Sequence, residues 1–144
     1  MKILLADSST QVCDRVERLL HKVEGLKIVG KAYTVRDAIV MSDRLKPDVV
    51  ISEILMNDGS GVTVVRHVTR ENSAPLVIML SNFSATNIRK KYLYAGADFF
   101  FDKSFEFEML PQFFKELQVS VTPQEVLQKT KSIIRKRYTS ANTE

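Results

Sequence analysis

The sequence predicts an α/β protein built on a doubly wound, five-stranded parallel sheet with helices on both faces. Five short apolar runs alternate with amphipathic stretches, and this alternation favours a repeated strand–helix unit. The runs are too short for helices and are largely continuous, as is typical of strands buried on both faces. They cover residues Lys2–Ala6, Leu26–Ala32, Val49–Ile54, Leu76–Leu80 and Asp98–Phe101.

The stretches between these runs repeat apolar residues at helical spacing. In the first of them, Val12, Val16 and Leu20 fall on one face. Pro47 halts the second predicted helix, and Gly96 can cap the fourth. The five predicted helices lie within residues 12–23, 35–45, 61–70, 88–93 and 110–117.

Length and composition fit a globular domain with a short extension. The chain has 144 residues, of which 44% are apolar and 26% charged, an ordinary balance for such domains. The single cysteine, Cys13, excludes an intrachain disulfide, and its place in a predicted helix favours a buried structural thiol. The apolar run before Asp7 is too short for a signal peptide, and no run approaches the ~20 residues that span a bilayer. We therefore expect a cytoplasmic protein that does not contact the membrane.

Residues 119–144 differ from the rest of the chain in pattern and charge. They hold five basic and two acidic residues, so they carry +3 of the net charge of +4. Residues 122–125, Thr-Pro-Gln-Glu, form a capping box with proline at the first helical position, which predicts a helix over residues 123–138. The end, residues 139–144, is predicted to be disordered. The chain thus divides into a domain over 1–118 and a basic C-terminal helical extension with a disordered end over 119–144. This helix could pack back on the domain, form a homodimer with a second subunit, or begin a longer output module.

Polar, reactive residues close or directly follow four of the five predicted strands. In a doubly wound sheet the active crevice lies at the carboxyl ends of the strands. Each residue alone would be an ordinary exposed loop residue, but their joint placement predicts one site. They are Asp7, Glu53, Ser81 and Lys103.

Together with these four residues, the pattern of residues 1–118 resembles the receiver domain of response regulators in two-component signal transduction. It is similar in particular to the chemotaxis-type regulators that consist of a single domain. The resemblance rests on Asp7-Ser8 after the first strand, on Val77–Ser81, and on Ala95–Lys103. It implies a flavodoxin-like (βα)5 fold, to which the separately predicted C-terminal helix over residues 123–138 is an extra element. It also implies signalling through a phosphorelay.

The resemblance assigns roles to the residues at the strand ends. Glu53 stands in the position of the phosphoacceptor aspartate, and Ser81 in that of the switch hydroxyl. Lys103 takes the position of the lysine that contacts the phosphoryl group, and Phe100, three residues earlier, that of the aromatic switch. No catalytic residue of an enzyme is implied.

The same resemblance implies a Mg²⁺ site with two departures from the family pattern. The ligands would be Asp7, Glu53 and the backbone carbonyl of Leu55, but Ser8 replaces the second acid and removes one negative charge. Glu53 carries its carboxylate on the order of 1 Å further than an aspartate, and such a displacement can cost ~100-fold in rate. We expect Mg²⁺ binding to be weakened or lost, and Mg²⁺-dependent phosphorylation to be impaired.

Three interpretations of Glu53 are open at this stage. It could form a fixed ion pair with Lys103, or it could partly mimic the phosphorylated state and activate the protein constitutively. It could also still accept a phosphoryl group slowly. Leu55 and Phe83, two residues beyond Glu53 and Ser81, would then flank the path of the attacking water and slow hydrolysis.

The leading functional prediction is a response regulator of the pseudo-receiver type that acts by binding proteins. Its partners would be a histidine kinase or another signalling protein, with the target bound on the face of the fourth helix, fifth strand and fifth helix. The alternative is a DNA-binding transcriptional regulator that uses the basic C-terminal tail. Nucleic acid is the less favoured partner, because the tail lacks a base-reading motif. An enzyme is the weakest option, since no histidine lies near the strand ends and no GxGxxG loop is present.

Overall fold

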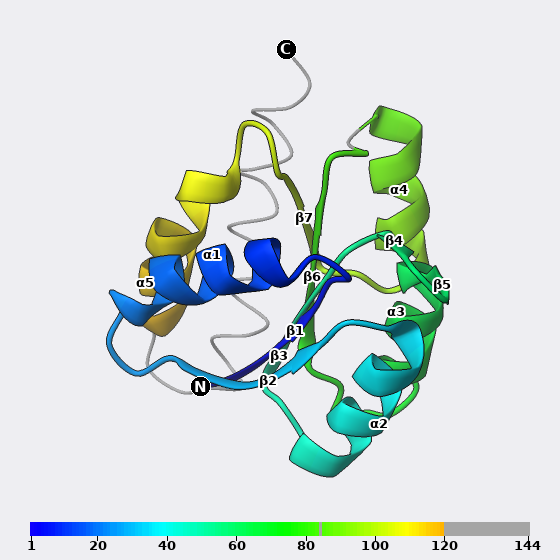
Figure 1. Cartoon of the computed structure of the whole chain (residues 1–144), viewed down its shortest axis with the longest axis horizontal. Coiled ribbons are helices and arrows are strands. Elements are labelled where there is room, and N and C mark those ends of the chain that lie inside the picture. The colour runs from blue at the N-terminus through cyan, green and yellow to red at the C-terminus, as the bar shows by residue number, and fades with distance from the viewer. Residues whose placement is uncertain (84, 120–144) are drawn as a thin grey trace.

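The computed structural model, which describes residues 1–83 and 85–119, confirms the predicted fold class. Five parallel strands form one sheet in the order β2-β1-β3-β6-β7, with helices on both of its faces (Figure 1). The strands are β1 (Lys2–Ala6), β2 (Lys27–Ala32), β3 (Val49–Ser52), β6 (Leu76–Ser81) and β7 (Phe99–Asp102).

The strand ends differ from the prediction by one or two residues. The third strand stops at Ser52, so Glu53 lies just beyond it. β6 and β7 each continue further than predicted, because Ser81 pairs with Asp102 in the sheet. These shifts affect the residues that build the site, since apolar pattern alone does not reveal where backbone pairing ends.

The helices lie close to their predicted positions. They are α1 (Thr10–His21), α2 (Val35–Leu45), α3 (Gly61–Val68), α4 (Thr86–Ala95) and α5 (Leu110–Gln118), with a short 3₁₀ helix, η1 (Phe107–Met109), before α5. Ser9, Thr34 and Ser60 cap α1, α2 and α3 through their hydroxyl groups. Gly96 caps α4 with φ of 116°, as predicted.

Two apolar cores cover the two faces of the sheet. Alternate residues of β1 divide between them, since neighbouring side chains of a strand point to opposite faces. Ile3 and Leu5 pack with α1 and α5, whereas Leu4 and Ala6 pack on the side of α2, α3 and α4. Figure 1 shows the same division, with α1 and α5 on one side and the other three helices opposite.

A small antiparallel hairpin follows β3 and was not predicted. Its strands are β4 (Leu55–Met56) and β5 (Gly59–Ser60), joined by Asn57 and Asp58. The sequence indicates only a glycine-containing loop here, because strands of two residues carry too little pattern to predict.

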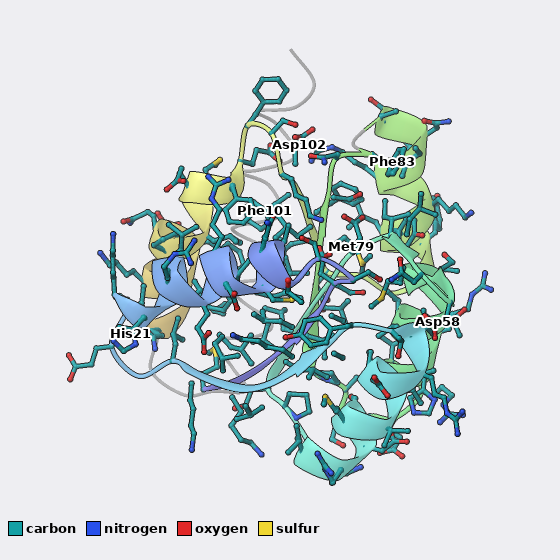
Figure 2. All side chains as sticks on the ribbon, viewed as in Figure 1. His21, Asp58, Met79, Phe83, Phe101 and Asp102 are labelled. Atoms are coloured by element: carbon teal, nitrogen blue, oxygen red, sulfur yellow. The ribbon has the colours of Figure 1, made fainter. Side chains whose placement is uncertain are left out.

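All active-site candidates lie at one end of this fold. Phe83, just beyond β6, and Asp102, the last residue of β7, mark that end in Figure 2. The helix predicted over residues 123–138 and the disordered end predicted over 139–144 lie outside the described residues. Within residues 1–83 and 85–119, no helix is long and apolar enough to cross a membrane.

Candidate functional site at the carboxyl end of the sheet

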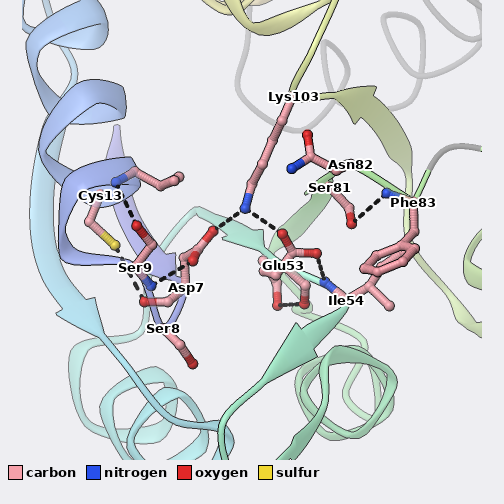
Figure 3. A network of polar contacts seen from close by, with 12 residues as sticks. Asp7, Ser8, Ser9, Cys13, Glu53, Ile54, Ser81, Asn82, Phe83 and Lys103 are labelled. Atoms are coloured by element: carbon pink, nitrogen blue, oxygen red, sulfur yellow. Dashed lines mark hydrogen bonds and ion pairs between the residues drawn. The ribbon is translucent and has the colours of Figure 1, made fainter.

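Asp7, Glu53 and Lys103 form a compact ion triad. The Lys103 Nζ donates a hydrogen bond to Asp7 Oδ2 at 2.6 Å and a second, short one to Glu53 Oε2 (Figure 3). The side chains of the three residues are only 9–11% exposed. Two carboxylates and one ammonium therefore share a site that is largely shielded from water.

The sheet explains why these residues meet. β1 and β3 are neighbouring parallel strands in which Ala6 pairs with Ser52, so the next residues, Asp7 and Glu53, emerge side by side. β7 is separated from β3 by β6. Lys103 follows β7, and only a long side chain can span β6 to reach both carboxylates.

The environment of Lys103 favours its charged form. Burial by itself would lower the pKa of the ammonium, but the hydrogen bonds to Asp7 and Glu53 and the two negative charges outweigh burial, so the pKa is raised above its usual value. Lys103 therefore stays protonated throughout the neutral range.

Glu53 uses both carboxylate oxygens. Oε2 binds Lys103, and Oε1 accepts a hydrogen bond of 2.5 Å from the Ile54 N–H. Gly61 secures the backbone nearby, because its N–H donates to the Ile54 carbonyl at 2.6 Å. A Cβ at Gly61 would lie 2.0 Å from the Glu53 carbonyl oxygen, which no side chain can tolerate.

Ser8 does not join the triad. Its hydroxyl points away from Lys103 (Figure 3), donates to the Tyr33 carbonyl at 2.9 Å and accepts from the Asn57 N–H at 2.9 Å. Ser8 thus links the loop after β1 to the loop after β2 and to the β4–β5 hairpin. Asp58 strengthens the same link by accepting from the Val35 and Arg36 N–H groups at the start of α2.

Ser81, Leu55 and Phe83 lie close to the triad residues in the chain and form no hydrogen bond with Lys103 among the described contacts. Ser81 is fully buried, and its hydroxyl accepts a hydrogen bond of 3.1 Å from the Phe83 N–H. The side chains of Leu55 and Phe83 are about half exposed, at 58% and 48%. The site therefore has bulky apolar groups at its rim.

Phe100 lies buried in β7 and is held by residues of α4. Its ring meets Tyr92 edge-on, with 6.4 Å between ring centroids, and the Arg89 guanidinium lies 5.0 Å above it. Arg89 also donates to the Phe100 carbonyl and to Glu106 Oε2, both at 3.2 Å. In the sequence Arg89 is followed directly by Lys90 and Lys91, and no local signal connects it with Glu106.

Cys13 is a buried structural thiol that contacts the backbone of Asp7. Its S–H donates to the Asp7 carbonyl at 3.7 Å. Burial and the negative charge of Asp7 raise the pKa of the thiol to about 11, so it is not a nucleophile at neutral pH.

The sequence matches the response regulator receiver domain family over residues 3–115. The chain belongs to this family, so it contains a receiver domain of two-component signalling, and the resemblance inferred from the strand-end residues is confirmed.

Similar proteins agree with this assignment. The chain is 32% identical over 107 residues to a protein-glutamate methylesterase/protein-glutamine glutaminase of Alkalilimnicola ehrlichii, a match that covers 73% of this chain and 27% of that protein. It is 29% identical to the response regulator protein VraR of Staphylococcus epidermidis, over 68% of this chain and 45% of VraR. The chain therefore spans less than half the length of these relatives.

Solved receiver domains share the fold. The isolated receiver domain of RcsB from Salmonella enterica serovar Typhimurium, solved in the presence of phosphomimetic BeF3⁻, superposes with a TM-score of 0.75. The two chains are 22% identical, and the match covers 89% of this chain and 96% of that one. At this identity the likeness concerns the fold alone.

Receiver domains typically bind Mg²⁺ at the phosphorylation site. Mg²⁺ requires near-octahedral oxygen ligation, whereas both carboxylates here bind the same ammonium and the Ser8 hydroxyl is used elsewhere. Among the described residues, no group of three acidic, histidine or cysteine side chains could hold a metal.

Proposed function

We propose that this chain is a pseudo-receiver: a response regulator that signals by binding proteins and is poorly phosphorylated at Glu53. The observation that carries the proposal is the ion triad of Asp7, Lys103 and Glu53. In this function the chain has no enzymatic activity of its own.

The geometry of Glu53 opposes phosphoryl transfer. A hydrogen bond makes a carboxylate oxygen less nucleophilic, and Oε1 and Oε2 of Glu53 are both hydrogen-bonded. The additional methylene group, compared with aspartate, shifts the attacking oxygen on the order of 1 Å, and misplacement of this size can cost ~100-fold in rate. Both effects slow the reaction.

The contacts favour a fixed ion pair over mimicry of the phosphorylated state. Mimicry would place the Ser81 hydroxyl against the negative group at Glu53. Among the described residues, no hydrogen bond joins the Ser81 hydroxyl to Glu53, and its contact is with the Phe83 N–H, from which it accepts. Glu53 therefore stabilises one resting arrangement of the site.

The partner surface that we propose is the face of α4, β7 and α5. Its exposed side on α4 presents Asn87, Lys90, Lys91 and Tyr94, which share one helix face at spacings of three and four residues. Tyr94 is 91% exposed, and α4 contains no acidic residue. Phe105 adds an 87% exposed ring from the loop after β7. A basic surface with exposed aromatic rings suits an acidic segment of a histidine kinase or other signalling protein.

DNA binding through residues 119–144 remains a prediction, because that segment lies almost entirely outside the described residues. No contact among the described residues favours it.

A mass measurement tests the proposal. We expect the protein to keep its mass when incubated with Mg²⁺ and a small-molecule phosphodonor such as acetyl phosphate. The double variant Glu53→Asp/Ser8→Asp should gain one phosphoryl group, because it restores an aspartate acceptor and a second acid.

The variant Glu53→Gln serves as the control that cannot be phosphorylated at this position. Rapid gain of a phosphoryl group by the unaltered protein, lost in Glu53→Gln, would refute the proposal and identify a working receiver with a glutamate acceptor.

A further inference from the structure

The two carboxylates of the site pose an electrostatic problem that does not depend on how the protein signals. Asp7 and Glu53 are 8% and 7% exposed and emerge from neighbouring strands. Two negative charges held close together in a shielded site repel each other strongly and need a compensating cation. In the described part of the chain, the cation that pairs with them is Lys103.

We propose that the Lys103 ammonium is the resident cation of this site and takes the place of a divalent metal ion between Asp7 and Glu53. The ammonium donates to one oxygen of each carboxylate, as a bridging cation would. A metal ion placed between the same two groups would compete for the Asp7 Oδ2 and Glu53 Oε2 atoms that Lys103 occupies.

Ser8 completes this arrangement by replacing the structural effect of a metal ion. A cation bound by residues of several loops holds those loops together. Here the Ser8 hydroxyl joins the loop after β1 to Tyr33 and to Asn57 in the hairpin, and Asp58 joins the hairpin to α2. These hydrogen bonds connect the loops around the site through groups of the protein itself.

The competing explanation is that Lys103 is a lysine of an ordinary receiver site that binds a metal ion beside it. The two explanations predict different effects of removing the ammonium. If Lys103 only stands beside a metal site, its loss leaves the metal affinity broadly as it was. If Lys103 replaces the metal, its loss creates a divalent cation site from Asp7 and Glu53.

The test is a Mn²⁺ titration followed by NMR, because bound Mn²⁺ broadens the amide signals near its site. The unaltered protein should show no selective broadening around Asp7 and Glu53 at millimolar Mn²⁺. Lys103→Met, which keeps an apolar chain of similar length and removes the charge, should bind Mn²⁺ at least tenfold more tightly at that position. The titration contains no phosphodonor, so its result is independent of the phosphorylation test.

Thermal unfolding gives a second measurement. Mg²⁺ should raise the midpoint temperature of unfolding of Lys103→Met well above the midpoint that this variant has in NaCl of equal ionic strength. The midpoint of the unaltered protein should be the same in Mg²⁺ and in NaCl. The matched control Asp7→Asn/Lys103→Met keeps one carboxylate and should lose most of the response to Mg²⁺.

Three outcomes would overturn the proposal. In the first, the unaltered protein binds Mn²⁺ selectively, with the affinity of Lys103→Met. In the second, Lys103→Met is folded but responds to neither Mn²⁺ nor Mg²⁺. In the third, Lys103→Met fails to fold in Na⁺ and in Mg²⁺. If Lys103→Met is unfolded in Na⁺ and folds in Mg²⁺, the proposal is supported in its strongest form.

Discussion

At the scale of single residues, the site depends on a glycine that carries no functional group. Gly61 begins α3, and its backbone lies against the Glu53 carbonyl. The close approach lets the Gly61 N–H donate to the Ile54 carbonyl at 2.6 Å, which fixes the chain just after Glu53. Position 61 is thus limited to glycine by space.

We therefore predict that Gly61→Ala destabilises the fold and disturbs the triad. A new Cβ would lie 2.0 Å from the Glu53 carbonyl oxygen, and relief requires a backbone shift that we expect to cost about 2–3 kcal/mol. Urea unfolding measures the cost, and the amide shifts of Glu53 and Lys103 report the displacement.

Gly30→Ala is the matched control. Its Cβ would meet the methyl ends of the Leu4 and Leu45 side chains, at 3.1 Å, and no backbone atom. An equal loss of stability in both variants would contradict the role given to Gly61.

At the scale of elements, Arg89 and Glu106 tie α4 to β7 and the loop that follows it. Their side chains are 17% and 16% exposed, so this ion pair is better shielded than those on the outer surface. Glu106 Oε2 also accepts a hydrogen bond of 2.6 Å from the Asp102 N–H. The pair therefore holds Phe100 in its buried position beneath the Arg89 guanidinium.

A double-mutant cycle should detect the interaction between Arg89 and Glu106. We predict a coupling free energy of about 1–2 kcal/mol between Arg89→Met and Glu106→Gln, together with faster hydrogen exchange at Phe100 in either single variant. Glutamine at position 106 keeps a side-chain oxygen that can accept the hydrogen bond from the Asp102 N–H. The cycle therefore measures the effect of the charge of Glu106 separately from that hydrogen bond.

Lys90→Met, on the exposed face of the same helix, provides the comparison. Lys90 has no carboxylate partner among the described residues, and we expect a change within about 0.5 kcal/mol. Coupling indistinguishable from zero between residues 89 and 106 would show that the pair contributes no stability.

At the scale of the whole molecule, the charged contacts determine how stability depends on pH. The hydrogen bonds that Asp58 accepts, first from the Val35 N–H and then from Arg36, lower the pKa of its carboxyl below 3.8. A carboxyl whose pKa is lowered by folding stabilises the fold above its unfolded pKa, and this contribution disappears as the pH falls through its folded pKa. The pKa of Lys103 is raised by folding, so its effect on stability depends on pH in the opposite direction. The ammonium stabilises the fold fully below pH 10.5, and this stabilisation is lost only above that value.

We predict that Asp58→Asn lowers the stability at pH 6, and that the difference from the unaltered protein shrinks steadily between about pH 4 and pH 2. Denaturant unfolding of both proteins at a series of pH values measures this difference in stability. A difference that stays constant down to pH 2 would mean that the charge of Asp58 contributes nothing to the contact with α2.

Much of this architecture could be predicted because its signals are local. Apolar periodicity placed the five main strands and the five helices to within a few residues, and the topology of parallel sheets placed Asp7, Glu53 and Lys103 at one edge. The β4–β5 hairpin was missed, since two-residue strands have no measurable periodicity. Arg89 and Glu106 are 17 residues apart, and no pattern in the chain connects them.

The fold, the family and the set of polar residues at the strand ends therefore follow from the residue pattern along the chain. Only the tertiary structure decided how those residues pair: that Lys103 reaches across β6 to both carboxylates, and that Ser8 turns to the hairpin. The physical reason is that backbone periodicity follows from each segment's own burial, whereas the partner of a polar side chain depends on distances between segments far apart in the chain.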